Sequence, residues 1–255
     1  MPQPSLTTTD LTIRFGGHVA VNRVTCAFHP GETTVIVGPN GAGKTTYFNL
    51  ISGQLTASEG SVQKGDTDIT RMSPSSRAKL GLGRAFQLTN LFPQLSVLEN
   101  IRLAVQARAG AGRILFRPAA KLVHLTQAAE KYLEAARLTA KASLPAAALP
   151  HGDQRKLEVA LLMAMEPDIY MFDEPTAGMS LDQAPAVLDL IAQIKSDPTK
   201  TVLLVEHKMD VVRALADRII VLHNGELLAD GPPNEVMGSQ IVRDVYLGTA
   251  TEETA

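Results

Sequence analysis

Residues 33–45 read Thr-Thr-Val-Ile-Val-Gly-Pro-Asn-Gly-Ala-Gly-Lys-Thr, and the prediction of the fold rests mainly on them. Its first five residues, Thr33–Val37, are β-branched and apolar in the manner of a buried strand. The next eight match the phosphate-loop pattern G-x-x-x-x-G-K-[ST], and a helix-like pattern follows over residues 43–51. A strand, a glycine-rich loop and a helix in this order favour an α/β protein with a nucleoside triphosphate site.

Each part of the loop has a predicted task. Its glycines let the backbone N–H groups turn inward around the phosphates, and the start of the helix adds its positive dipole end. Lys44 supplies a cation for the β- and γ-phosphates, and the Thr45 hydroxyl is a ligand for Mg²⁺. The residues predicted to bind ATP in this loop are Gly38, Pro39, Asn40, Gly41, Ala42, Gly43, Lys44, Thr45 and Thr46.

Other strand-length runs surround this loop in the sequence. Continuous apolar runs occur at residues 169–172, 201–205 and 218–222, with helix-like segments at 181–195 and 209–216. Apolar strands of this kind suit a mainly parallel sheet that helices cover on both faces. Residues 6–13 and 19–28 alternate more and flank Gly16-Gly17, which predicts an antiparallel β hairpin beside the core. The predicted class is a P-loop NTPase core with an antiparallel β subdomain.

Two carboxylates follow the apolar run at 169–172, namely Asp173 and Glu174. A buried strand that ends at the phosphates would bring Asp173 to the Mg²⁺ ion, and Glu174 to the attacking water as a general base. By itself the pattern also fits a strand that ends in a solvated acidic turn. His207 follows the strand at 201–205, so we expect it at the same edge of the sheet, donating to the γ-phosphate.

The middle of the chain differs in pattern. Residues 88–166 read as an inserted helical lobe, in which Ser96 and Glu99 form a capping box at the start of one helix. Residues 101–141 carry eight Lys or Arg against two Glu, a local net charge of +6. This charge fits either a solvated helical face or a face toward an anionic membrane. We therefore expect one domain over residues 1–248, with its core at 1–87 and 167–248, and a flexible tail at 249–255.

Composition excludes several classes. The chain has 255 residues, 45% of them hydrophobic, and a net charge of −2, which argues against disorder and against a nucleic-acid partner. Cys26 is the single cysteine, so a disulfide scaffold is excluded. No apolar run approaches the roughly 20 residues of a membrane-spanning helix, and the first residues lack the pattern of a secretory signal. The sequence therefore predicts a cytoplasmic protein.

The phosphate loop, Gln87, the stretch Asp173-Glu174-Pro-Thr, and His207 occur in an order and spacing that resemble an ATP-binding cassette (ABC) ATPase. The resemblance covers almost the whole chain and implies further roles. Phe15 would stack on the adenine ring. The alternative is that Phe15 is a core residue of the hairpin. Gln87 would contact Mg²⁺ and the attacking water, as a metal ligand and a catalytic residue. Residues 88–98 would receive a coupling helix from a membrane subunit.

The family's signature, Leu-Ser-Gly-Gly-Gln before a helix, aligns with Leu149, Pro150, His151, Gly152 and Asp153. Pro150 has no hydroxyl and no N–H where the signature serine donates to the partner's γ-phosphate. His151 would replace that donor or would be a loop histidine. Our hypothesis is that the contact in trans is weaker but intact. Ser180 is a second departure, because the family has Asp there.

A narrower resemblance rests on the stretch Arg14-Phe-Gly-Gly17, on residues 151–158 and on the tail at 231–236 and 245–248. These stretches resemble the ATPase subunits of importers for branched-chain amino acids and related solutes such as urea and amides. The resemblance implies a head-to-tail dimer with a second ATPase subunit, the same or different, on the inner face of the membrane. It also implies permease subunits and a solute-binding protein as partners. An exporter of lipid or lipopolysaccharide, or an ABC ATPase that does not transport, is the alternative.

Overall fold

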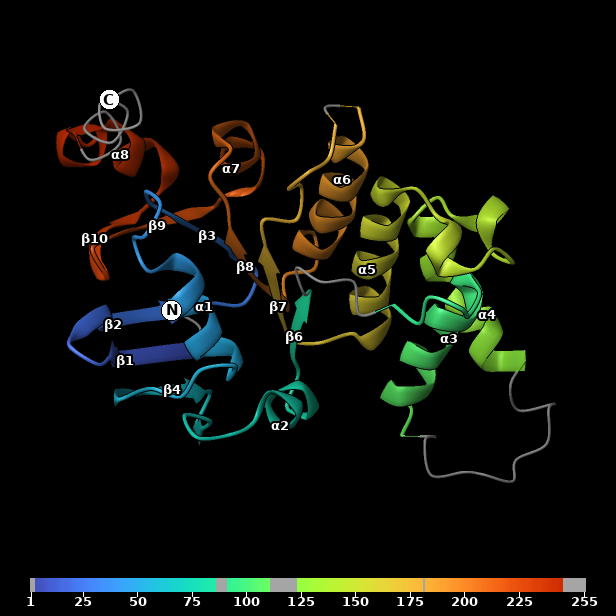
Figure 1. The fold of residues 1–255 in the computed structure, drawn as a ribbon, viewed down its shortest axis with the longest axis horizontal. Coiled ribbons are helices and arrows are strands. Elements are labelled where there is room, and N and C mark those ends of the chain that lie inside the picture. The colour runs from blue at the N-terminus through green and yellow to red at the C-terminus, as the bar shows by residue number, and fades with distance from the viewer. Residues whose placement is uncertain (1–2, 86–90, 111–122, 181, 245–255) are drawn as a thin grey trace. The chain divides into compact units, whose positions relative to one another are not determined.

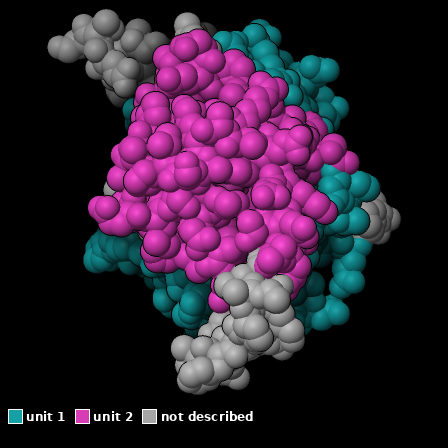
Figure 2. All heavy atoms as spheres, turned by 90° about the vertical axis from the view of Figure 1, so that its right-hand side faces the viewer, with its two compact units in different colours: residues 1–82, 168–174, 197–255 teal, residues 83–167, 175–196 magenta. Residues whose placement is uncertain are grey.

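The computed structural model describes residues 3–85, 91–110, 123–180 and 182–244. Contacts divide the chain into two compact units (Figures 1 and 2). One comprises residues 1–82, 168–174 and 197–255, and we call it the core unit; the other comprises residues 83–167 and 175–196, and we call it the helical unit. In Figure 2 the helical unit presents one continuous surface on the face shown.

A six-stranded sheet has the order β10-β9-β3-β8-β7-β6. Its strands are β3 (Thr33–Val37), β6 (Leu82–Ala85), β7 (Ile169–Asp173), β8 (Thr201–Val205), β9 (Arg218–His223) and β10 (Glu226–Gly231). β3 runs parallel to both β8 and β9, and β7 runs parallel to β8. Every residue of β3, β7 and β8 is buried, which explains why their sequences are continuously apolar.

The second sheet is antiparallel, in the order β2-β1-β4-β5. Its strands are β1 (Leu6–Phe15), β2 (His18–Phe28), β4 (Glu59–Lys64) and β5 (Thr67–Asp68). β1 and β2 pair as the predicted hairpin, with Phe15 opposite His18 at its tip. The α/β class, the mainly parallel sheet and the antiparallel β subdomain are thereby confirmed.

Helix α1 (Lys44–Ser52) follows the phosphate loop, and a buried arginine holds its far end. The Arg77 side chain, 1% exposed, donates to the carbonyl oxygens of Leu50 and Ile51. Arg77 belongs to α2 (Pro74–Lys79), and its charge complements the negative end of the α1 dipole. The core unit also contains α7 (Met209–Leu215) and α8 (Pro233–Gly238).

The helical unit contains α3 (Val97–Arg108), α4 (Val123–Ala135), α5 (His151–Met165) and α6 (Ala184–Lys195), with short 3-10 turns at Thr139–Lys141 and Ala146–Ala148. α5 packs against α3, α4 and α6 (Figure 1). Residues 175–196, which the sequence pattern assigned to the core, thus group with the helices. The predicted helix at 181–195 begins later, at Ala184, because Pro185 fits only the first turn of a helix.

Ser96 caps α3 as predicted, but the capping box is only half built. The Ser96 hydroxyl accepts from the Glu99 N–H at 3.1 Å. The Glu99 carboxylate binds Arg102 on the next turn, at 2.7–3.0 Å. The presence of a cation three residues further along therefore turns Glu99 outward.

Candidate nucleotide site

The phosphate loop leaves the carboxyl end of β3 with three glycines at positive φ. Gly38, Gly41 and Gly43 have φ values of 150°, 77° and 94°. A Cβ at Gly38 would lie 2.1 Å from the Leu222 carbonyl oxygen, and one at Gly43 would lie 2.6 Å from that of Ala20. Glycine is therefore required at both positions for the backbone conformation and for close packing.

Lys44 folds back over this loop. Its ammonium donates to the carbonyl oxygens of Gly38 at 2.7 Å and Pro39 at 2.8 Å, and the residue is 8% exposed. Burial lowers the pKa of Lys44 below its ordinary value, while the nearby carboxylates of Glu174 and Asp173 oppose that shift. The loop cation and the two predicted acidic residues therefore belong to one electrostatic cluster.

Asp173 and Glu174 lie at the end of β7, beside the end of β8. Asp173 is the last residue of the strand, pairs in register with Val205 and is 6% exposed. The Glu174 N–H donates to the Val205 carbonyl at 2.9 Å. Glu174 has a φ of 47°, a left-handed conformation that non-glycine residues adopt at a cost of about 1–2 kcal/mol. The turn thus separates the two carboxylates: one is buried at the strand end and the other is one-third exposed.

His207 follows β8 and faces Glu174. Its Nδ1 lies 3.4 Å from the Glu174 Oε1 and 4.0 Å from the Glu206 Oε2. The imidazole is 55% exposed, whereas the Glu206 side chain is 1% exposed. No role was predicted for Glu206 from the sequence. Its position could have indicated one, because an acid there directly follows an apolar strand and precedes a histidine.

The donor set fits a magnesium ion together with a triphosphate. Mg²⁺ prefers hydroxyl and carboxylate oxygens and keeps several waters, so one or two protein ligands suffice. The buried Asp173 carboxylate belongs to the same cluster as Lys44, and Thr45 is the first residue after Lys44 in α1. The Gln87 position lies outside the described residues.

Phe15 ends β1 at the hairpin tip and is 50% exposed. It is not a buried hairpin core residue. The partner strand β2 reaches the phosphate loop, since Gly43 packs against Ala20. The turn after β9 also contacts this loop, because the Gly225 N–H donates to the Ala42 carbonyl. An exposed ring at this tip fits a stacking role, which stays a prediction.

The signature residues lie in the helical unit, at the start of α5. Pro150 is the N-cap residue, and its carbonyl accepts from Asp153 and Gln154. His151 is exposed and Gly152 is buried, with Gln183 lying 2.8 Å from the place of a Gly152 Cβ. The Asp153 carboxylate pairs with Lys141 and Lys156.

The loop that carries Ser180 lies beside this signature. Gly178 packs against the His151 ring, which lies 3.6 Å from the place of a Gly178 Cβ, and Gln183 packs against Gly152. The Ser180 hydroxyl bonds to the Asp182 carboxylate and lowers the pKa of Asp182. Both departures from the family pattern therefore lie at one end of α5.

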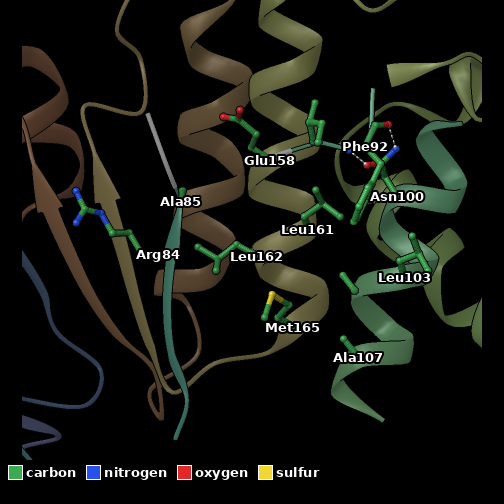
Figure 3. A pocket seen from close by; sticks show the side chains of 12 residues that line it. Arg84, Ala85, Phe92, Asn100, Leu103, Ala107, Glu158, Leu161, Leu162 and Met165 are labelled. Atoms are coloured by element: carbon green, nitrogen blue, oxygen red, sulfur yellow. Dashed lines mark hydrogen bonds between the residues drawn. The ribbon is translucent and has the colours of Figure 1, made fainter. Parts of the chain in front are cut away.

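A groove of about 360 Å³ opens in the helical unit (Figure 3). Its walls are mostly apolar side chains of α3, α5 and the segment before α3, including Leu103, Leu161 and Phe92. Phe92 is 57% exposed, and Asn100 holds its backbone through bonds to both its N–H and its carbonyl. Glu158 also lines the groove. Burial raises the pKa of Glu158, while its bond to Arg155 opposes the rise.

A glycine-rich phosphate loop at the carboxyl edge of a parallel sheet, with acidic residues and a histidine at the ends of the neighbouring strands, defines a P-loop ATPase. The family model described as ABC transporter matches residues 21–177. The chain belongs to this family, whose members bind nucleotide and hydrolyse ATP in transport, and the predicted resemblance is confirmed.

Relatives extend along the whole chain. LivG of Escherichia coli K12, a high-affinity branched-chain amino acid transport ATP-binding protein, is 36% identical over 98% of this chain and 100% of LivG. BraF of Pseudomonas aeruginosa, which has the same description, is 35% identical over the same shares. The solved ADP conformation of an ATP-binding cassette of an ABC transporter has a TM-score of 0.82, with 26% identity over 97% of this chain and 100% of that one.

The part of the chain that the structure describes contains no helix with the length and apolar character needed to cross a bilayer.

Proposed function

We propose that this chain is the ATP-hydrolysing subunit of an importer for branched-chain amino acids or related small solutes, such as urea and amides. The observation that carries the proposal is the likeness to LivG and BraF, which extends over 98% of this chain and the whole of each relative. It would work on the inner face of the membrane, with permease subunits as direct partners and a solute-binding protein as an indirect one.

The chemistry assigned to the site is hydrolysis of ATP by an in-line water. The Thr45 hydroxyl and the Asp173 carboxylate would hold Mg²⁺, with Gln87 as a further ligand, and the bound ion neutralises charge on the β- and γ-phosphates. The Glu174 carboxylate takes the proton of the attacking water. Lys44 and His207 donate to the γ-phosphate, so that charge stabilisation supplies most of the catalysis.

The adenine and the second subunit complete the proposed site. Phe15 stacks on the adenine ring. Residues 149–153 bind the γ-phosphate held by a second ATPase subunit, through Gly152 and the first turn of α5. Dimeric structures of related cassettes, 25–26% identical to this chain, support this arrangement. Two ATP molecules would close the dimer, and hydrolysis would reopen it.

The groove in the helical unit supports the proposal that a permease subunit docks there. Its Phe92 wall belongs to residues 88–98, the segment expected to receive a coupling helix, and its apolar lining suits the apolar face of a short helix. An exposed aromatic side chain beside an apolar groove is typical of the centre of a binding surface.

Affinity purification from membranes tests the proposal. We expect the tagged chain to bring down two kinds of permease subunit, and the assembled complex to take up a branched-chain amino acid when ATP is supplied. Outward movement of lipid by the complex would favour an exporter. Recovery with ribosomes and without membrane subunits would contradict the transporter assignment.

A further inference from the structure

We propose that Glu206 is a positioning residue, which holds His207 in place through the backbone of the turn after β8. The inference rests on the role proposed above for His207 in hydrolysis.

The carboxylate of Glu206 is bonded to the turn that carries the histidine. Its Oε2 accepts from the N–H of His207 at 2.9 Å and from the N–H of Lys208 at 3.1 Å. The Glu206 N–H donates to the Ile36 carbonyl at 3.3 Å. Ile36 lies on β3, two residues before the phosphate loop, so Glu206 links the histidine turn to the strand that carries that loop.

Burying the Glu206 carboxylate costs free energy unless hydrogen bonds offset the lost hydration. Glu206 is 1% exposed, directly after five buried residues of β8. An apolar side chain there would continue the strand, whereas a buried carboxylate loses its hydration and needs strong hydrogen bonds in return. Both of these acceptor bonds go to the turn, so the carboxylate fixes the backbone conformation there.

His207 needs such a support, because its ring is poorly held. The imidazole is 55% exposed, and its 3.4 Å distance to Glu174 is long for a hydrogen bond. With the backbone fixed, few torsions remain between the anchored N–H and the ring nitrogens. A misplacement of about 1 Å in a catalytic group can lower turnover by about a hundredfold, which is the loss that the turn would prevent.

The test compares variants of the full chain in the assembled complex. Glu206→Leu removes the acceptor but fills the buried space, and we expect kcat for ATP to fall at least about tenfold with KM changed less than about twofold. Glu206→Gln keeps one acceptor oxygen within reach of both N–H groups, so it should restore most of the loss. Glu206→Ala is the second variant if Glu206→Leu does not fold, as judged by circular dichroism and melting temperature.

Asp217→Ala is the matched control. Asp217 accepts from the Thr33 N–H at 2.9 Å, at the opposite end of β3, so its loss removes a comparable bond away from the site. We expect Asp217→Ala to lower the melting temperature without lowering kcat.

A double variant separates positioning from stability. Because Glu206 acts through His207, adding Glu206→Leu to His207→Ala should cost no further turnover. An equal loss in both backgrounds, or wild-type kcat in a folded Glu206→Leu variant while His207→Ala is impaired, would overturn the inference alone. Wild-type kcat in His207→Ala would instead overturn the proposed role of the histidine, and the inference with it.

Discussion

Glu174 carries both the predicted catalytic carboxylate and an unfavourable backbone conformation. It is the predicted general base, and its φ of 47° is unfavourable for any residue with a Cβ. Strained residues persist where the surroundings fix them, and here the bond from Glu174 N–H to the Val205 carbonyl holds the turn. The sequence predicts the carboxylate because it follows an apolar strand, but it contains no signal for the backbone strain.

Comparison of two catalytically disabled variants measures this strain. Glu174→Ala and Glu174→Gly both remove the carboxylate, but only glycine adopts the left-handed conformation without cost. We expect the free energy of unfolding to be about 1 kcal/mol higher for Glu174→Gly than for Glu174→Ala. Denaturant unfolding of both proteins measures the difference, and an alanine variant as stable as the glycine variant would argue against strain.

Asp153 supplies a prediction about pH. Burial alone raises its pKa, but the hydrogen bonds from Lys141 and Lys156 outweigh burial and hold the pKa below its ordinary value. A carboxyl whose pKa is lowered on folding contributes stability above its unfolded pKa of about 4, and this stability is lost as the pH falls through the folded value. The signature thus contains a charged cluster that stabilises the protein at neutral pH.

The variant Asp153→Asn should lower the free energy of unfolding by about 1 kcal/mol at neutral pH. The difference from the wild type should begin to shrink below a pH of about 4, the unfolded pKa, and vanish once the pH falls through the lower folded value. Urea unfolding at a series of pH values measures it. Asp189→Asn is the control, because its pair with Arg137 is exposed on both sides. A difference for Asp153→Asn that does not change with pH would contradict an electrostatic origin of this stability.

At the scale of elements, burial decides what the sequence predicts. β3, β7, β8 and β9 were predicted to within one residue because they are continuous apolar runs in the sheet interior. β4, β5 and β10 carry exposed or partly exposed residues with no clear alternation, so they were not predicted. The groove could not be predicted from the sequence either. Phe92 and Leu161, which both line it, are far apart in the chain and come together only through helix packing.

A substitution in the groove tests whether permease subunits dock there. Leu161→Arg places a charge on its apolar wall, and we expect at least about tenfold weaker recovery of permease subunits, since a buried unpaired charge is costly. ATP binding by the chain should be unchanged. Ile241→Arg is the matched control, because Ile241 is 61% exposed and lies in the core unit. Equal recovery of permease with both variants would contradict docking at the groove.

At the scale of the whole molecule, the phosphate loop and the signature lie in different compact units of the chain. The loop, the two acids and the histidine were predictable from local sequence, since each follows a strand of the core. The signature was identified only by its resemblance, because Pro150, His151 and Asp153 depart from the pattern. Its packing against the Ser180 loop depends on tertiary contacts that no local pattern encodes.

Two substitutions at Gly152 test whether the signature acts on a partner's ATP. The two atoms nearest to a Cβ there, at 2.8 and 2.9 Å, belong to the flexible end of the Gln183 side chain, so Gly152→Ala should be tolerated. Gly152→Asp adds a negative charge facing the γ-phosphate, and we expect turnover of the assembled complex to fall at least about tenfold. ATP binding by the isolated chain should be the same in both. Unchanged turnover with Gly152→Asp would exclude the contact in trans.

We propose above that this chain powers transport by hydrolysing ATP, with Glu174 as the base. The most direct measurement is ATP hydrolysis and solute uptake by the complete transporter in proteoliposomes, with wild-type chain and with Glu174→Gln. We predict that Glu174→Gln binds ATP with wild-type affinity while hydrolysis falls at least about a hundredfold and uptake stops. Hydrolysis and uptake at the wild-type rate in this variant would contradict the claim.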